Sequence, residues 1–236
     1  MRIGAIIFSR MSSTRLPGKA LIDICGKTLL QRVIERTQKI NLIQHFCIAT
    51  SNEAEDDKIV EFANENGIDV YRGSLNNVIE RATEASIKYK YDSFLRVCGD
   101  RPFLDSEIYD RMITLHKKDK NDLTTNIFPR TVPPGLTGEI IDVKSLIQVL
   151  NLTSNKLDSE HLTRYYYNNS KKFKIYNYES FKDKETIKLR LVIDDNDDLL
   201  RTRWIVSQLD ENNITNSQTN KIISLAKDWN KIIQIK

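Results

Sequence analysis

Short apolar runs alternate with amphipathic segments through the first half of the chain. Residues 3–8 have the pattern of a buried strand, and similar runs predict strands at 45–50, 68–71 and 93–98. Between them, apolar residues at helical spacing predict helices that begin at Thr28 and cover 54–66, 74–89 and 105–118. Strand and helix alternate four times, which predicts an α/β fold with a mostly parallel central sheet and helices on both faces.

The pattern is less regular in the second half of the chain. Strands are expected at 123–125, 139–143, 172–178 and 186–193. One helix is expected to begin near residue 144, and others are expected at 158–165, 199–209 and 218–233. A further short extended piece is expected at 20–24. The sequence contains no internal repeat and no linker rich in Gly or Ser. We therefore expect one domain over residues 1–236, with a small inserted subregion in its second half.

Composition and charge narrow the function classes. Of 236 residues, 40% are apolar and 29% are charged, as in a globular protein. The formal net charge is only +4, and no basic run with interleaved aromatics is present, so we expect no nucleic acid partner. No run approaches the roughly 18 apolar residues of a membrane span, and we expect no membrane association and a cytoplasmic location. The three cysteines form no CxxC pair, so neither a zinc site nor a disulfide framework is indicated.

The segment after the first strand carries the densest group of polar chemistry. From Ser9 to Lys19 the chain carries three cations (Arg10, Arg15 and Lys19), the hydroxyl side chains of Ser12, Ser13 and Thr14, and a Pro-Gly turn. Cations, short donors and exposed backbone N–H groups beyond a strand end suit a polyphosphate, so we predict a nucleoside triphosphate site. No GxxxxGK[ST] motif and no GxGxxG motif is present. The alternative is an ordinary basic surface loop.

Other polar residues follow the ends of the predicted parallel strands. Ligands of such sheets bind beyond the carboxyl ends of the strands, so these residues should converge with the Ser9 loop. They are Thr50, Arg72, Gly99 and Asp100.

Two aspartates are candidate ligands for a divalent metal. Asp100 follows the fourth strand, and Asp194 follows the run 186–193. Mg²⁺ commonly takes one or two carboxylates together with phosphate oxygens. Each aspartate also has a simpler interpretation, Asp100 as a turn residue before Pro102 and Asp194 as a helix cap.

The loop closely resembles the signature of the sugar-acid cytidylyltransferases, nearest to the spore coat polysaccharide biosynthesis protein F type. Related families are the 3-deoxy-manno-octulosonate and acylneuraminate cytidylyltransferases. The resemblance starts in Ile6–Lys19 and recurs in the same order at 71–81, 96–103, 134–139, 159–163 and 192–199. The first motif is long and specific, and the others are short.

The resemblance implies a Rossmann-like nucleotidyltransferase fold and CTP-dependent activation of a sugar or sugar acid, with pyrophosphate release. It places nucleotide binding in about residues 1–120 and acceptor binding and dimerisation in about 121–236, and it implies a homodimer. By position, the nucleotide would contact Ser9, Arg10, Ser13, Arg15, Lys19, Thr50, Arg72 and Gly99. The catalytic group would comprise Arg10, Arg15, Lys19 and Asp100, with Mg²⁺ on Asp100 and Asp194.

The acceptor is implied to be an anionic sugar that faces Arg101, Glu139, His161 and Arg164. Taken alone, His161 reads as a packed or exposed histidine and Glu139 as a solvated strand residue. Arg101 stands where relatives often carry a small or acidic residue, which leaves the acceptor open. The competing hypotheses are a nucleotide-sugar-dependent glycosyltransferase, a nucleotidyltransferase with another nucleotide or a non-sugar acceptor, and a non-catalytic nucleotide-binding module.

Overall fold

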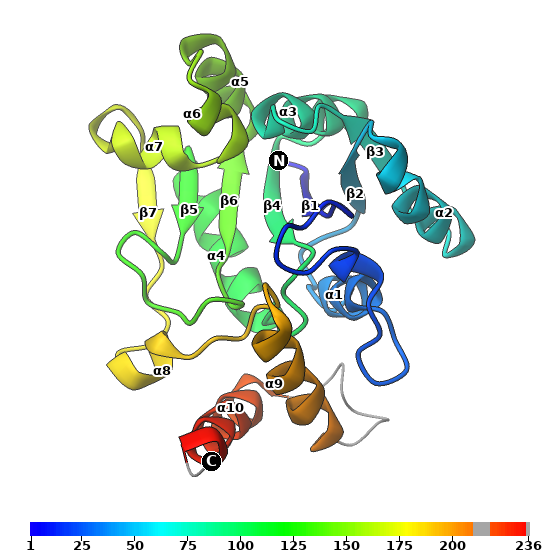
Figure 1. Ribbon diagram of the computed structural model, residues 1–236. Helices are drawn as coiled ribbons and strands as arrows, with labels where there is room; N and C mark the ends of the chain where they lie inside the picture. The colour runs from blue at the N-terminus through cyan, green and yellow to red at the C-terminus, as the bar shows by residue number, and fades with distance from the viewer. Residues whose placement is uncertain (210–217, 235–236) are drawn as a thin grey trace.

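A seven-stranded sheet crosses the protein in the computed structural model, which describes residues 1–209 and 218–234 (Figure 1). The strand order is β3-β2-β1-β4-β6-β5-β7. The strands are β1 (Ile3–Phe8), β2 (Phe46–Ser51), β3 (Val70–Gly73), β4 (Ser93–Cys98), β5 (Leu123–Thr125), β6 (Glu139–Asp142) and β7 (Ile175–Asn177).

The first four strands are parallel, as their alternation with helices predicted. β1 lies between β2 and β4, and β3 extends the sheet beyond β2. β6 runs antiparallel to both β4 and β5, and β7 is parallel to β5. The single sheet therefore joins the two halves that the sequence suggested, and the carboxyl ends of β1 to β4 share one edge.

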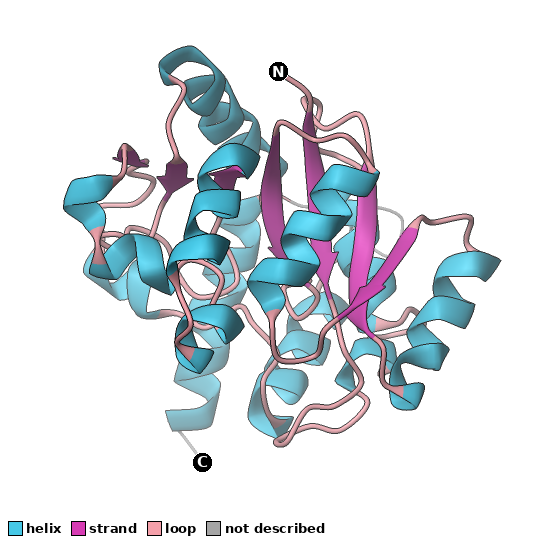
Figure 2. Cartoon of the chain, turned by 90° about the horizontal axis from the view of Figure 1, so that it is seen from above, coloured by secondary structure: helices cyan, strands magenta, loops and turns pink. Residues whose placement is uncertain are grey.

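Helices cover both faces of the sheet (Figure 2). One apolar core packs β1 and β4 against α1 (Leu29–Thr37), α2 (Asp57–Glu65), α4 (Ser106–Asp119), α9 (Asn196–Ser207) and α10 (Thr219–Gln234). The second core lies on the other face, under α3 (Val78–Lys88), α5 (Val143–Leu152) and α7 (Arg164–Asn168). Burial on both faces explains the near-continuous apolar runs of the central strands.

Local capping explains where several helices begin. The Thr28 side chain accepts a hydrogen bond from the Gln31 N–H at 3.1 Å, which starts α1 where the sequence predicted it. Asn77 caps α3 in the same way. The predicted helices at 199–209 and 218–233 are α9 and α10, whose starts lie within three residues of the predicted ones. No helix in the described ranges is long and apolar enough to cross a membrane.

Several expectations for irregular segments were wrong. Residues 186–193 do not form a strand, because Asp183 caps a short helix, α8 (Lys184–Lys188), and residues 189–193 then run outside the sheet. The expected helix at 158–165 is interrupted at His161, between α6 (Lys156–Glu160) and α7. The expected extended piece at 20–24 begins instead as a short 3₁₀ turn, Lys19–Leu21.

The path of residues 189–193 places the closing aspartate. The Leu191 N–H donates to the Pro134 carbonyl at 2.7 Å, and the Ile193 N–H donates to the Asp100 carbonyl at 3.0 Å. Backbone hydrogen bonding to the loop after β4, and not a strand pairing, therefore brings Asp194 beside Asp100.

Candidate active site

The loop after β1 folds back on itself. The Met11 carbonyl accepts hydrogen bonds from the Ser13 N–H at 2.9 Å and from the Gly18 N–H at 3.0 Å. Gly18 has φ of 70°, a left-handed conformation that glycine adopts without strain. The loop thus presents its hydroxyl and cationic side chains from a closed backbone turn.

Asp56 anchors this loop to the end of β2. Its buried carboxylate accepts hydrogen bonds from the Met11 N–H at 2.6 Å, the Ser51 N–H at 2.9 Å and the Ser51 hydroxyl at 2.5 Å. Burial alone would raise the pKa of Asp56, but these donors favour the charged form and lower it. Sequence reasoning missed Asp56, since it resembles any acidic residue in a first helical turn.

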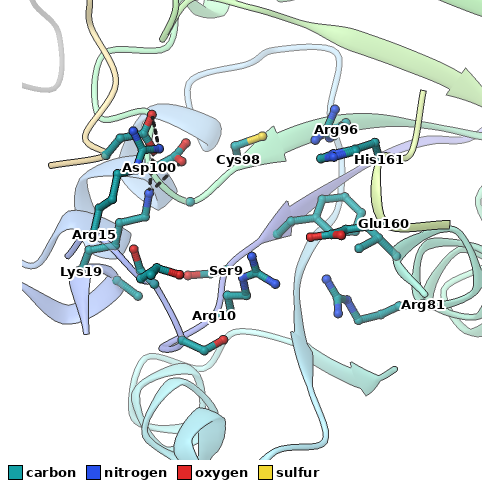
Figure 3. A pocket seen from close by; sticks show the side chains of 18 residues that line it. Ser9, Arg10, Arg15, Lys19, Arg81, Arg96, Cys98, Asp100, Glu160 and His161 are labelled. Carbon is teal, nitrogen blue, oxygen red and sulfur yellow. Dashed lines mark hydrogen bonds and ion pairs between the residues drawn. The ribbon is translucent and has the colours of Figure 1, made fainter. Parts of the chain in front are cut away.

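The loop forms one wall of a pocket of about 360 Å³ at the carboxyl edge of the sheet (Figure 3). Arg15, Lys19 and Asp100 lie at one end in this view, and Arg81, Arg96, Glu160 and His161 lie at the other. The site residues predicted from the sequence that line the pocket are Ser9, Arg10, Ser13, Arg15, Lys19, Gly99, Asp100, His161 and Asp194.

Lys19 joins the two predicted metal-ligand aspartates. Its Nζ lies 3.1 Å from a carboxylate oxygen of Asp100 and 3.1 Å from one of Asp194, and it donates to the Ile193 carbonyl at 2.8 Å. Arg15 reaches the other Asp194 oxygen at 3.5 Å. This end of the pocket therefore combines two carboxylates with two cationic side chains.

Asp198, in the first turn of α9, holds the backbone of Asp194. Its carboxylate accepts the Asp194 N–H at 3.0 Å and the Arg190 Nη2 at 2.7 Å, and it also pairs with Arg201. Burial by itself raises the pKa of Asp198, but the hydrogen bonds from Arg190 and Arg201 prevail and lower it to about 2. This carboxylate is therefore ionised at neutral pH and holds the Asp194 backbone in place.

The donor set at Asp100 and Asp194 fits the Mg²⁺ that the resemblance implies. Hard carboxylate oxygens are the protein ligands that Mg²⁺ takes, commonly one or two of them with phosphate oxygens and water. The ammonium of Lys19 between the two carboxylates shows that the position accepts a cation. Within residues 1–209 and 218–234, no three His, Cys, Asp or Glu side chains gather as a metal cluster.

The opposite end of the pocket is rich in arginine. Arg81 is buried and donates to the Ser74 carbonyl at 2.5 Å. Burial, followed by the nearby charge of Arg10, lowers its pKa to about 10. Neither Arg10 nor Arg81 forms an ion pair in the described part of the chain. Arg10 is exposed and Arg81 is buried, and two neighbouring cations without counter-ions, one of them buried, favour an anionic ligand. In the sequence, Arg81 is a charged residue on the otherwise apolar face of α3. This signal could have indicated a site residue, and it was not used.

Five of the predicted site residues do not line the pocket, and four of them point elsewhere. Thr50, near the end of β2, is fully buried. Arg72 turns away and pairs with Asp57 at 2.5 Å. Arg101 donates to the Thr137 carbonyl at 2.6 Å, and Arg164 pairs with Asp158. Strand-end position alone did not indicate which way these side chains point.

Glu139 also lies outside the pocket lining, behind Arg96. It is 2% exposed, whereas the sequence interpretation allowed a solvated residue. Its carboxylate accepts Arg96 Nη1 at 2.6 Å, and Arg96 itself lines the pocket. Arg96 belonged to a recognised motif but was not assigned to the site.

Comparisons with known proteins show the family to which the chain belongs. A family model described as cytidylyltransferase matches residues 4–224. The chain is 30% identical over 198 residues to the spore coat polysaccharide biosynthesis protein SpsF of Bacillus subtilis, a match that covers 82% of this chain and 81% of that protein. It is 33% identical over 113 residues to the 3-deoxy-manno-octulosonate cytidylyltransferase of Geobacter metallireducens, covering 48% of this chain and 44% of that one.

A solved structure extends the likeness over the whole fold. The structure of a cytidylyltransferase from Leptospira borgpetersenii serovar Hardjo-bovis matches with a TM-score of 0.90 and 31% sequence identity. The match covers 100% of this chain and 98% of that chain. The fold predicted from the sequence is therefore confirmed as that of the nucleotidyltransferases.

Proposed function

The chain belongs to the cytidylyltransferase family and is thus a nucleotidyltransferase that uses CTP; on that premise, we propose that it transfers CMP to a hydroxyl group of an anionic sugar, with Mg²⁺, and releases pyrophosphate. The observation that carries the proposal is the meeting of Lys19, Asp100 and Asp194 beside the loop after β1. These three residues come from distant parts of the sequence and gather where the triphosphate would lie.

The loop supplies the groups that would hold the triphosphate. Arg10, Arg15 and Lys19 bring positive charge, and Ser13 brings a hydroxyl donor. The anchored backbone keeps these groups in place before the nucleotide arrives, which lowers the cost of ordering them. Gly99 lies against Ser9, where an added Cβ would come within 2.9 Å of the serine side chain, so the floor of the pocket stays open.

Asp100 and Asp194 would hold Mg²⁺. When bound, the ion would neutralise phosphate charge and lower the pKa of a coordinated hydroxyl. The Lys19 ammonium would then move from the two carboxylates to the phosphate oxygens.

The transfer requires positioning and charge stabilisation more than covalent catalysis. The acceptor oxygen forms a bond to the α-phosphorus, and the bond from that phosphorus to the β-phosphate bridging oxygen breaks. The hydroxyl proton leaves to solvent, and pyrophosphate carries away the charge of the broken bond. On this proposal Lys19 and Arg15 would lie beside that developing charge and would stabilise the transition state.

The acceptor would occupy the pocket end that His161 lines. The relatives named as acting on 3-deoxy-manno-octulosonate and in spore coat polysaccharide biosynthesis support a sugar or sugar acid for a surface glycoconjugate. A cytoplasmic location and a homodimer remain predictions.

Pyrophosphate release, measured for CTP, UTP, dTTP, ATP and GTP with a panel of sugars and sugar acids, tests the proposal. We expect pyrophosphate release with CTP that requires Mg²⁺. Asp100→Asn and Asp194→Asn should each lose this Mg²⁺-dependent release. A nucleotide-sugar-dependent glycosyltransferase would instead release a nucleoside diphosphate from a nucleotide sugar. Binding of CTP without pyrophosphate release for any acceptor in the panel would contradict the proposed transfer.

A further inference from the structure

A buried acid holds the guanidinium at the acceptor end of the pocket. Arg96 of β4 and Glu139 of β6 are partners in the antiparallel register, and Arg96 Nη1 donates to Glu139 Oε2 at 2.6 Å. Arg96 reaches the pocket, which His161 also lines, and both are seen at the same end of it in Figure 3. The pair thus runs from the interior of the sheet to the pocket surface.

The Glu139 carboxylate accepts three hydrogen bonds from other side chains of the protein. Its Oε1 accepts the Thr163 hydroxyl at 2.7 Å and the Tyr167 hydroxyl at 2.6 Å, while Oε2 takes Arg96. Burial by itself would raise the pKa of Glu139, but the charge of Arg96 and the two hydroxyl donors lower it. An ionised carboxylate that is 2% exposed and bonded to three protein donors is closed off from a sugar in the pocket, so its role is to orient Arg96.

Arg96 keeps donors that the protein leaves unused. Its Nε is buried and has no partner in the described part of the chain, and only Nη1 is engaged by Glu139. A buried ion pair adds little net stability compared with apolar residues of similar volume. Net stability therefore does not explain why this pair is present. Its effect is to hold the Arg96 guanidinium in one orientation toward the pocket.

We propose that Arg96 binds the carboxylate of the acceptor and that Glu139 is its positioning residue. The proposal rests on the proposed function, because the metal ligands and Lys19 reserve the other end of the pocket for the triphosphate (Figure 3). A planar guanidinium matches a carboxylate through two parallel hydrogen bonds, which a lysine ammonium cannot reproduce. The acceptor class is thus a sugar acid, selected against neutral sugars at Arg96.

Binding in the ternary complex tests the assignment without catalysis. The full chain is saturated with Mg²⁺ and a non-hydrolysable α,β-methylene analogue of CTP. It is then titrated by calorimetry with 3-deoxy-manno-octulosonate, with N-acetylneuraminate and with the C1 amide of each. We expect the wild-type protein to prefer at least one acid to its amide, and Arg96→Lys to lose roughly 10- to 100-fold in affinity for that acid only.

Two further variants separate positioning from folding. Glu139→Gln should weaken acid binding while leaving the affinity for the CTP analogue unchanged. If this variant unfolds, the double variant Arg96→Met/Glu139→Gln removes both charges and should fold, yet show no preference for acid over amide. Arg111→Lys alters an exposed Arg–Glu pair, with N–O distance 3.8 Å, and should match the wild type.

The outcomes are distinct. Equal or greater loss of affinity for the CTP analogue in Arg96→Lys would make Arg96 a phosphate contact and overturn the proposal. Failure of both acids to bind the wild-type ternary complex would also overturn it, even with CTP-dependent pyrophosphate release intact on another acceptor. Loss of acid binding in Arg96→Lys with full binding in Glu139→Gln would remove the positioning role of Glu139.

Discussion

Replacement of Lys19 by methionine should have opposite effects on metal binding and on turnover. Methionine keeps much of the apolar stem but removes the ammonium that lies 3.1 Å from both Asp100 and Asp194. Without nucleotide, this ammonium competes for the oxygens that would hold a divalent ion. We therefore expect Lys19→Met to bind Mn²⁺ more tightly in the absence of CTP, and to release pyrophosphate more slowly in its presence.

The size of the effect follows from charge and exposure. A unit charge pair at 4 Å is worth about 4 kcal/mol at an effective dielectric constant near 20. Solvent screens part of this, since the Lys19, Asp100 and Asp194 side chains are 17%, 23% and 25% exposed, and Arg15 remains 3.5 Å from Asp194. We expect a gain of about 1.4 to 2.8 kcal/mol, or roughly 10- to 100-fold in the dissociation constant.

Turnover should fall for a different reason. Negative charge grows on the leaving pyrophosphate, and loss of one preorganised donor to such charge typically costs about 100- to 1,000-fold in rate. The expected loss lies mainly in kcat, because the interaction strengthens in the transition state.

Mn²⁺ binding can be followed by electron paramagnetic resonance without nucleotide, and turnover by pyrophosphate release. Lys27→Met is the matched control. Lys27 also forms a lysine–carboxylate pair, with an N–O distance of 2.6 Å to Glu35, but neither residue lines the pocket. Unchanged or weaker Mn²⁺ binding in Lys19→Met would refute the competition between ammonium and metal. Unchanged kcat would remove Lys19 from the transition state.

Three further predictions concern the scaffold of the site. Asp56→Asn removes the charged acceptor of the Met11 N–H, so urea unfolding should show a loss of about 1–3 kcal/mol, and KM for CTP should rise. His116 is fully buried, and burial lowers its pKa to about 4 from 6.5, so between pH 6.5 and about 4 the unfolded chain takes up this proton and the folded protein does not. The unfolding free energy should therefore fall by roughly 2–3 kcal/mol from pH 7 to 4.5, and His116→Gln should lack this component. Gly135→Ala would place a Cβ 2.3 Å from the Leu191 carbonyl oxygen at a φ of 108°, which should cost roughly 2 kcal/mol or more of stability and lower activity by displacing the segment before Asp194.

Each of these predictions has a control or a contrary outcome. Asp57→Asn alters an exposed carboxylate next to Asp56 and should leave stability within about 0.5 kcal/mol. Equal pH dependence of unfolding in wild type and His116→Gln would refute the histidine argument. Gly26→Ala shares the positive φ but meets no atom within 4 Å, so it should cost only about 1 kcal/mol. An equal cost at Gly135 would show that the contact with Leu191 is unimportant.

The candidate site could be predicted best where chemistry and chain order coincide. The loop from Ser9 to Lys19 carries its cations, hydroxyls and turn within eleven positions, so local sequence indicates a phosphate site without knowledge of the rest. Asp100 follows directly from the end of a predicted parallel strand. Asp194 was expected at the site for the wrong local reason, since no strand precedes it and backbone hydrogen bonds bring it to Asp100.

The predicted residues that lie outside the pocket share one feature, the direction of their side chains. Thr50 and Arg72 stand at strand ends as expected, yet one is buried and the other pairs with Asp57. Arg81 and Glu139 were underestimated because each is a charged residue on an otherwise apolar face, and sequence alone does not show what such a charge meets.

Periodicity and strand-end position were enough to predict the α/β sheet and the helices on both faces, and the dense loop chemistry was enough to predict phosphate binding at one edge of the sheet. These features depend on local backbone preferences and on a repeat that the chain order displays. Which carboxylate reaches the pocket, and which one stays behind it to hold Arg96, depended on contacts between residues far apart in sequence. Such contacts form only when strands and loops pack, so the arrangement of Lys19 between two aspartates and of Glu139 behind Arg96 became visible only in the folded protein.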